Sequence, residues 1–138
     1  MSASRTVAVT LIVLGSACAD VPLARVESVA GDVRFEVFVD EARTAQERVR
    51  GLRDRTLEPD EGLLIAFPVV GEVCILNAGV DLDIDAIYAG ADGRIVAVER
   101  GVLAGDAMAR CHGDTARVLE IRSGVAAEVV PSDVLVLR

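Results

Sequence analysis

The chain has 138 residues, enough for one small domain, and 52% of them are hydrophobic while only 3% are aromatic, so aliphatic side chains must fill its core. Its 14 basic residues are all arginine and stand against 22 acidic ones, which gives a formal net charge of −8. Nucleic-acid binding depends on clustered cations that neutralise phosphates, so this charge argues against a nucleic-acid partner and against electrostatic docking onto anionic lipid.

Residues 1–17 have the layout of a secretory signal peptide. Arg5 precedes the short apolar run Val7–Leu14, and small residues follow that run. The run is much shorter than the roughly 20 apolar residues that a transmembrane helix needs. The start of the chain therefore predicts export rather than a permanent membrane span.

The next residues resemble a bacterial lipobox, in which a cysteine becomes the lipidated first residue of the mature protein. The string is Leu14-Gly15-Ser16-Ala17-Cys18, and it departs from a lipobox at Gly15, where leucine is preferred. We expect Cys18 to be the lipid anchor of a periplasmic or cell-surface lipoprotein. Cleavage near Ala17 without lipidation, which would release a soluble secreted protein, is the alternative.

The first part of the mature chain is expected to contain a tether, a strand and a short helix. Residues 18–30 have no strong periodicity and predict a lipidated N-terminus and tether, which leaves 31–138 as a single β-rich domain. Apolar residues alternate with polar ones over Val33–Val39, the pattern of a half-buried strand. Thr44 and Glu47 form a capping-box pattern, and Gly51 is a typical left-handed helix stop.

The remainder of the chain predicts short strands. An Asp-Gly pair at residues 92–93 between two apolar runs is a hairpin signal. A long loop is expected at Gly101–Thr115, and a short helix or turn at Gly124–Val130. The expected strands are Leu63–Phe67, ended by Pro68, then Val73–Leu76, Ile84–Ala89, Ile95–Val98, Arg117–Ile121 and Val134–Leu137. Many short strands with one or two small helices predict a mainly β, β-rich α+β fold that is compact and barrel-like.

Two cysteines remain if Cys18 is lipidated. In an oxidising compartment, a disulfide between Cys74 and Cys111 is the first expectation. It would stabilise the domain by about 3–4 kcal/mol. It would also hold the expected loop at 101–115 against the strand near Asn77. Two unpaired thiols, or a metal or catalytic site with His112, remain as alternatives. A structural zinc site usually needs four N or S ligands, more than these residues supply.

Short motifs follow one another along residues 36–137 in a specific order. They are Ala42, Glu47-Arg48, Gly51-Leu52, Arg55, Leu57, Glu61–Leu64, Phe67-Pro68, Asn77, Leu82–Ile84, Asp92–Val96, Val118–Glu120, Gly124 and Ser132–Val134. This ordered set resembles the bacterial and archaeal domain-of-unknown-function family 192. The resemblance implies a compact β-barrel-like fold, often found behind a signal peptide, and no assigned activity.

The most recognisable run of that family is altered in this chain. The family pattern reads Phe-Trp-Met-x-Asn-Thr, then two residues, then Pro-Leu-Asp, and it corresponds here to residues 73–83. Asn77, Leu82 and Asp83 agree with it. The departures are Cys74 for Trp, Ile75 for Met, Ala78 for Thr and Asp81 for Pro. The resemblance therefore implies the fold but carries over no ligand.

Several polar residues are candidates for binding: Asn77, Asp83 and His112. Asp83 alternates with Asp81 and Asp85, which could hold a hard cation through oxygen ligands or could simply cap turns on a solvated strand face. Asn77 is expected to bridge backbone groups. A basic stretch, Arg48, Arg50, Arg53 and Arg55, either pairs with Glu58, Asp60 or Glu61 or binds an anion. No catalytic residue, metal site or cofactor is predicted.

The sequence favours a non-enzymatic, monomeric module that binds a small ligand or an envelope protein and touches the membrane only through its lipid. The alternative is a hydrolase-like or metal-dependent enzyme that uses Asp83, Asn77 and the Cys111-His112 loop. A chain that keeps the fold after losing its ancestral function is a third possibility. Whether those side chains meet in one concave pocket separates the first two hypotheses.

Overall fold

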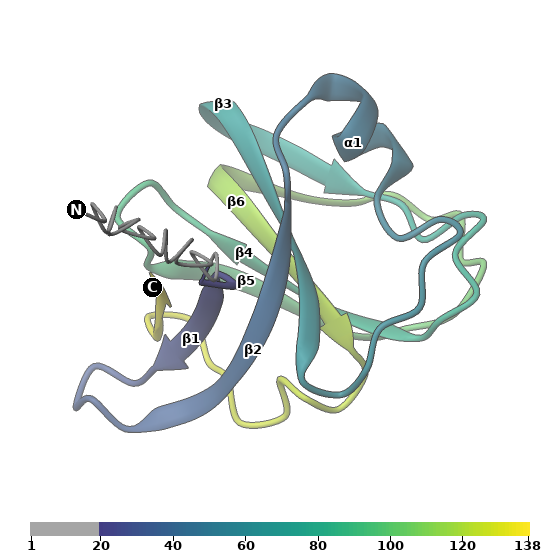
Figure 1. Ribbon diagram of the computed structural model, residues 1–138. Coiled ribbons are helices and arrows are strands. Elements are labelled where there is room, and N and C mark those ends of the chain that lie inside the picture. The colour runs from purple at the N-terminus through teal and green to yellow at the C-terminus, as the bar shows by residue number, and fades with distance from the viewer. Residues whose placement is uncertain (1–19) are drawn as a thin grey trace, which may run out of the picture.

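Alternating apolar and polar residues place most of residues 20–138, the part of the chain that the computed structural model describes, in strands (Figure 1). The elements are β1 (Leu23–Glu27), β2 (Val33–Ala42), α1 (Ala45–Arg50), β3 (Glu61–Ile75), β4 (Ile84–Ala89), β5 (Ile95–Val102), β6 (Arg110–Arg122) and β7 (Val134–Leu137). The predicted β-rich, barrel-like fold is confirmed. The predicted signal peptide and the lipidation site at Cys18 lie outside the described residues.

The seven strands form one curled sheet in the order β5-β4-β6-β3-β2-β1-β7 (Figure 1). β2 and β3 are parallel, with α1 in the connection between them, and all other neighbouring strands are antiparallel. The curl brings β7 against the β4–β5 hairpin, where Leu135 N–H donates to the Gly93 carbonyl at 2.8 Å. The sheet is therefore a half-barrel.

The hairpin predicted at residues 92–93 is confirmed, and it explains why glycine stands at this contact. Gly93 has a φ of 84°, and a Cβ at this position would lie 2.5 Å from the Leu135 carbonyl oxygen. Among the amino acids, only glycine can adopt this conformation with the neighbouring backbone so close. The turn thus joins the two ends of the curled sheet.

Side chains of the strands point alternately to the two faces of the sheet, and both faces are buried. One cluster contains Val37, Leu119 and Ile121 and is covered by Ala126 and Val129 from the turns after β6. The opposite cluster is covered by the segment after α1 and by the loop after β3, and it includes Leu52, Leu57, Leu63, Ile65, Val80, Tyr88 and Val118. No helix within residues 20–138 is long and apolar enough to cross a membrane.

The capping box predicted for the helix is present. Thr44 Oγ1 accepts from Glu47 N–H at 3.1 Å, and Glu47 Oε2 accepts from Thr44 N–H at 2.9 Å. The hydrogen bonds that the Glu47 carboxylate accepts from the backbone N–H groups of Thr44 and Arg43 lower the pKa of Glu47. Gly51 ends the helix with a φ of 51°, and its N–H donates to the Glu47 carbonyl at 3.0 Å. The short α1 is therefore fixed at both ends.

The predicted tether at 18–30 is wrong for Leu23–Glu27, which form β1 in the interior of the sheet order. β1 pairs with both β2 and β7, and Ala24 and Val26 are fully buried. Only these two inward positions mark the strand, and the small Ala24 gives one of them little hydrophobic signal. The domain therefore begins before residue 31.

The predicted strand end at Pro68 is also wrong, because β3 continues to Ile75. Its ladder with β6 is irregular between Ala66 and Gly71. Proline lacks an N–H donor, and Pro68 lies in this break, where no ladder bond is lost. The two strands expected at 63–67 and 73–76 are thus one bent strand.

The long loop expected at Gly101–Thr115 is mostly strand. β5 continues to Val102 and β6 begins at Arg110, so the connection spans only residues 103–109. The glycines that suggested a loop include Gly113, which lies within β6 where its register with β3 shifts. Residues 124–130 form turns, as one of the two expectations for them stated.

Candidate functional site

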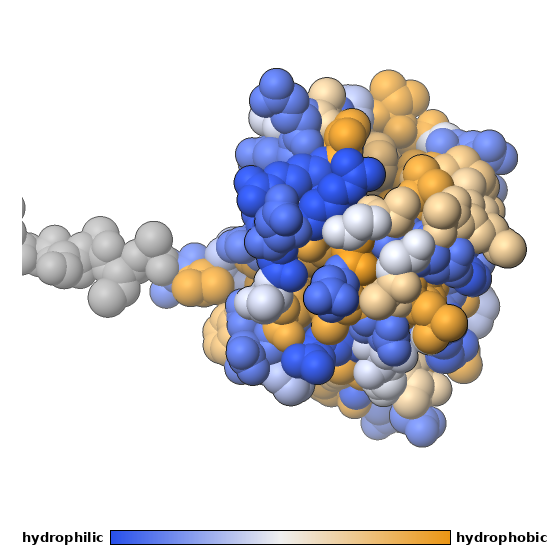
Figure 2. Space-filling view, turned by 90° about the vertical axis from the view of Figure 1, so that its right-hand side faces the viewer, coloured by the Kyte–Doolittle hydropathy of each residue, from blue (hydrophilic) through white to orange (hydrophobic). Residues whose placement is uncertain are grey.

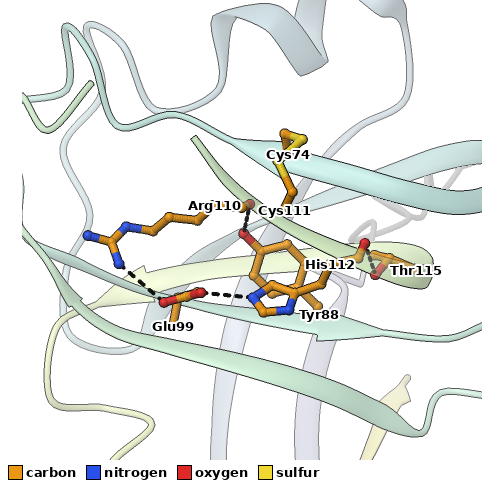
Figure 3. Close-up of a disulfide and its surroundings, with 7 residues drawn as sticks. All are labelled: Cys74, Tyr88, Glu99, Arg110, Cys111, His112 and Thr115. Carbon is orange, nitrogen blue, oxygen red and sulfur yellow. Dashed lines mark hydrogen bonds and ion pairs between the residues drawn. A yellow bond between two sulfur atoms is a disulfide. The ribbon is translucent and has the colours of Figure 1, made fainter. Parts of the chain in front are cut away.

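The predicted pairing of Cys74 with Cys111 is present as a disulfide (Figure 3). The two cysteines lie directly opposite each other on the antiparallel strands β3 and β6, with their Cα atoms 4.0 Å apart. The bond therefore joins two strands of the sheet, and it does not pin a loop as the sequence suggested. Since both thiols are in the bond, neither is available here as a metal ligand or nucleophile.

Beside the disulfide, His112 belongs to a polar network rather than to an open site (Figure 3). His112 Nε2 lies 2.8 Å from Glu99 Oε1, and Arg110 donates to the other oxygen of Glu99 at 3.2 Å. The His112 ring packs edge-on against Tyr88, with 4.5 Å between ring centroids. Tyr88 is fully buried and its hydroxyl donates to the Arg110 carbonyl at 2.7 Å. This burial raises the pKa of Tyr88.

Asn77 is held by backbone groups, in agreement with its expected bridging role. The side chain is buried, and its Nδ2 donates to the carbonyls of Leu82 and Leu103, each at 2.9 Å. Its backbone N–H donates to the Asp106 carbonyl at 3.1 Å. Asn77 therefore ties the end of β3 to the loop that follows β5.

The three alternating aspartates differ in environment. Asp83 Oδ1 accepts from Ala104 N–H at 2.7 Å, and Asp81 is exposed. Asp85 is buried in β4 and accepts from the backbone N–H groups of Gly101, Gly124 and Ala126. This geometry favours turn capping for Asp83 and Asp85, but the expected solvated strand face is wrong, because only Asp85 lies in a strand and it is buried. Asn77 and Asp83 thus both bind backbone groups of the loop after β5, at Leu103 and Ala104, whereas His112 is paired with Glu99.

A hollow of about 390 Å³, which we call the helix pocket, lies between α1 with its following turn and the strand β3. Its lining is mainly apolar and includes Leu52, Ile65, Phe67, Cys74, Ile75, Leu76 and Val80. Figure 2 views the molecule from the side on which α1 lies and shows exposed hydrophobic residues directly beside hydrophilic ones. A concave, mostly apolar hollow with few polar groups is the usual form of a small-molecule site.

Glu120 on β6 is the buried polar group of the helix pocket. It is 4% exposed, and its Oε2 has no hydrogen-bond partner among residues 20–138. The residues opposite it on β3 and β4 are Leu63 and Ala86, both apolar. Burial in these surroundings disfavours the carboxylate and raises the pKa of Glu120 to about 7.

Arginines surround the same pocket. Arg48, Arg50 and Arg53 line it, and no salt bridge within residues 20–138 involves any of them. The pairing expected with Glu58, Asp60 or Glu61 is not among the salt bridges of the described residues, and Arg55 pairs with Asp40 at 3.1 Å. Arg50 and Arg53 therefore form no salt bridge with a carboxylate of the described residues, whereas Arg48 interacts electrostatically with Glu47.

Sequence reasoning did not identify Glu120 as a site residue. In the sequence, Glu120 is a single acidic residue between Leu119 and Ile121. Its neighbours in the strand are buried on both faces of the sheet. In a strand with one solvated face, such a residue points to water. Only the tertiary structure shows that the segment after α1 and the loop after β3 cover this face.

Comparisons with known proteins agree on the fold. The model of the DUF192 family, described as uncharacterised ACR, matches residues 26–135. A Sinorhizobium meliloti protein proposed to be a transcription regulator has a similar structure, with a TM-score of 0.79 at 24% identity over 83% of this chain and 92% of that one. A Novosphingobium aromaticivorans protein of unknown function gives a TM-score of 0.76 at 25% identity over 83% of each chain. No curated protein matches the sequence.

Proposed function

Because the chain belongs to the DUF192 family of uncharacterised proteins, which supplies no activity, we propose a function from the molecule's own features: it is an exported module that binds a small ligand in the helix pocket. A lipid on Cys18 holds it at the cell envelope. The observation that carries the binding role is the buried, unpartnered Glu120 in a mainly apolar hollow. Buried polar atoms are almost always hydrogen-bonded, so an exception inside a pocket points to a missing partner.

Export is supported by the disulfide between Cys74 and Cys111. Disulfides persist in oxidising compartments and are rare where thiols are kept reduced. The position of β1 adds a constraint on the anchor, because the chain enters the sheet at Leu23. Five peptide steps separate Cys18 from Leu23, a reach of at most about 18 Å. A lipid on Cys18 would hold the domain close to the bilayer surface.

The enzyme alternative has less support from this geometry. Asn77 and Asp83 bind backbone groups, and His112 is paired with Glu99. General acid–base or nucleophilic catalysis needs groups that converge on one reacting position. The polar groups of these three side chains are instead engaged with other groups of the protein.

The anchor is tested by replacing Cys18 with alanine in the full chain expressed in its host. We expect the variant to lose incorporation of labelled fatty acid and to move from the membrane fraction to the soluble fraction. Its melting temperature should stay unchanged, because residue 18 precedes the first strand. Intact-mass measurement of an unmodified Cys18 in the membrane-bound native protein would contradict the anchor.

The binding role is tested by amide NMR titrations of the mature protein with hexanol and with anilinonaphthalene sulfonate. We expect saturable shifts that are largest for residues of the helix pocket with either probe. Leu76→Trp should abolish them, because Leu76 lines the pocket and is 53% exposed, so a larger side chain can fill the hollow without entering the core.

The matched control is Leu103→Trp, at a residue that is 63% exposed and does not line the helix pocket. It should leave both titrations unchanged. Absence of saturable binding for both probes, or shifts that persist in Leu76→Trp, would refute the proposed binding site.

A further inference from the structure

The helix pocket has opposite polar groups at two depths. Glu120, at 4% exposed, lies at its buried end, whereas Arg50 and Arg53 line it from exposed positions. Apolar residues, Ile65 and Val80 among them, also line the hollow. A ligand that fills it meets an acidic group in its buried part and basic groups near the surface.

The acidic end requires a hydrogen-bond donor that the protein does not supply. Glu120 Oε2 has no hydrogen-bond partner among the described residues. Tyr88 lies in the cluster on the same face of the sheet, but its hydroxyl donates to the Arg110 carbonyl. Above the carboxylate stands Gly51, where an added Cβ would lie 3.9 Å from Oε2. Residue 51 thus contributes no side-chain atom at this point.

The exposed arginines of the pocket suit an anionic group. Arg48 is partly committed, since it donates to the carbonyls of Arg43 and Ala66 and lies 5.8 Å from the centroid of the Phe67 ring. Arg53 uses only its Nε, which donates to the Ala78 carbonyl at 3.2 Å. The remaining guanidinium donors of Arg53 and those of Arg50 suit a carboxylate or phosphate, which arginine binds through paired N–H groups.

We infer that the ligand is an amphipathic organic acid with a hydrogen-bond donor at its opposite end, an ω-amino or ω-hydroxy acid in the simplest form. Its acid group binds Arg50 and Arg53, its apolar middle contacts the pocket walls, and its ammonium or hydroxyl donates to Glu120. This inference rests on the proposed binding role of the helix pocket and specifies the chemistry that the pocket selects.

The test compares compounds that share a six-carbon body in NMR or calorimetric titrations of the mature protein. These are hexanol, hexylamine, hexanoate, and the hexanoates that carry a terminal amine or hydroxyl, with shorter and longer homologues to match the span. We expect the best bifunctional acid to bind at least about tenfold more tightly than hexanoate and hexylamine, which corresponds to about 1.4 kcal/mol.

Paired variants assign each end. Glu120→Gln should remove the advantage of the amino acid over hexanoate, while Glu128→Gln, the same charge change at an exposed site outside the pocket, should not. The double change Arg50→Gln with Arg53→Gln should remove the advantage over hexylamine. Arg94→Gln is its control, because Arg94 is exposed on the β4–β5 hairpin and forms no salt bridge among the described residues.

The outcomes separate this inference from the proposed function. Hexanol or hexylamine that binds in the helix pocket as tightly as every bifunctional acid would overturn the ligand class and leave the binding role intact. Pocket binding of anilinonaphthalene sulfonate without binding of any bifunctional acid would have the same meaning. Loss of all pocket binding would refute the binding role itself.

Discussion

A variant with both Cys74 and Cys111 replaced by alanine is expected to unfold with a free energy about 3–4 kcal/mol below that of the native protein. The two residues are 37 positions apart, and a cross-link over a loop of this length removes that much conformational entropy from the unfolded chain. The folded sheet should persist, because β3 and β6 also share an extended ladder. Denaturant unfolding followed by circular dichroism measures the difference.

The same experiment has an internal control. A reducing agent should lower the stability of the native protein to that of the double variant and leave the variant unchanged. Thiol titration of the denatured, unreduced native protein should detect neither cysteine. Two free thiols at these positions, or equal stability of the native protein with and without reductant, would contradict the disulfide.

Glu120→Gln is expected to stabilise the protein by about 3 kcal/mol above neutral pH. Burial raises the pKa of Glu120 from 4.5 to about 7, and each tenfold change in an acid dissociation constant corresponds to about 1.4 kcal/mol. Between pH 4.5 and about pH 7, Glu120 therefore carries a proton in the folded state that it has lost in the unfolded state. Native stability falls as the pH rises through this window and then levels off, whereas glutamine has no proton to lose.

Urea unfolding of both proteins across the pH range from about 4 to 9 measures this difference. The two curves should meet at the acidic end, where Glu120 is neutral in both states, and separate towards neutral pH. Glu128→Gln, at an exposed position, should follow the native curve. Parallel native and Glu120→Gln curves would show that Glu120 is not desolvated. If removal of this carboxylate stabilises the protein, the result would indicate that Glu120 is kept for binding and not for folding.

The sequence predicted the elements whose signals are local. The capping box at Thr44 and Glu47 and the hairpin at Gly93 each depend on a few neighbouring residues, and both are present. β1 was missed because its burial depends on strands at distant points in the chain, with only Ala24 and Val26 pointing inward. Pro68 and Gly113 suggested breaks, yet both lie where the ladder of β3 and β6 is already irregular.

The candidate site was less predictable than the fold. The disulfide partners followed from cysteine number and compartment, but their place on two adjacent strands did not. Asn77 was expected to bridge backbone groups and does so. Glu120 has no distinctive neighbours in sequence, and its importance arises from the segment after α1 that covers it in space. A pocket formed between α1 and β3 depends on tertiary packing that no local pattern encodes.

The position of β1 between β2 and β7 has a consequence for how the molecule is made. Leu23 and Arg138 exchange backbone hydrogen bonds at 3.0 and 2.9 Å, so almost the first and last described residues are partners. During synthesis or threading through a translocation channel, one edge of β1 stays unpaired until the final strand arrives. Such long-range pairing is slow and leaves an open edge prone to association. The sheet is complete only after β7 has emerged.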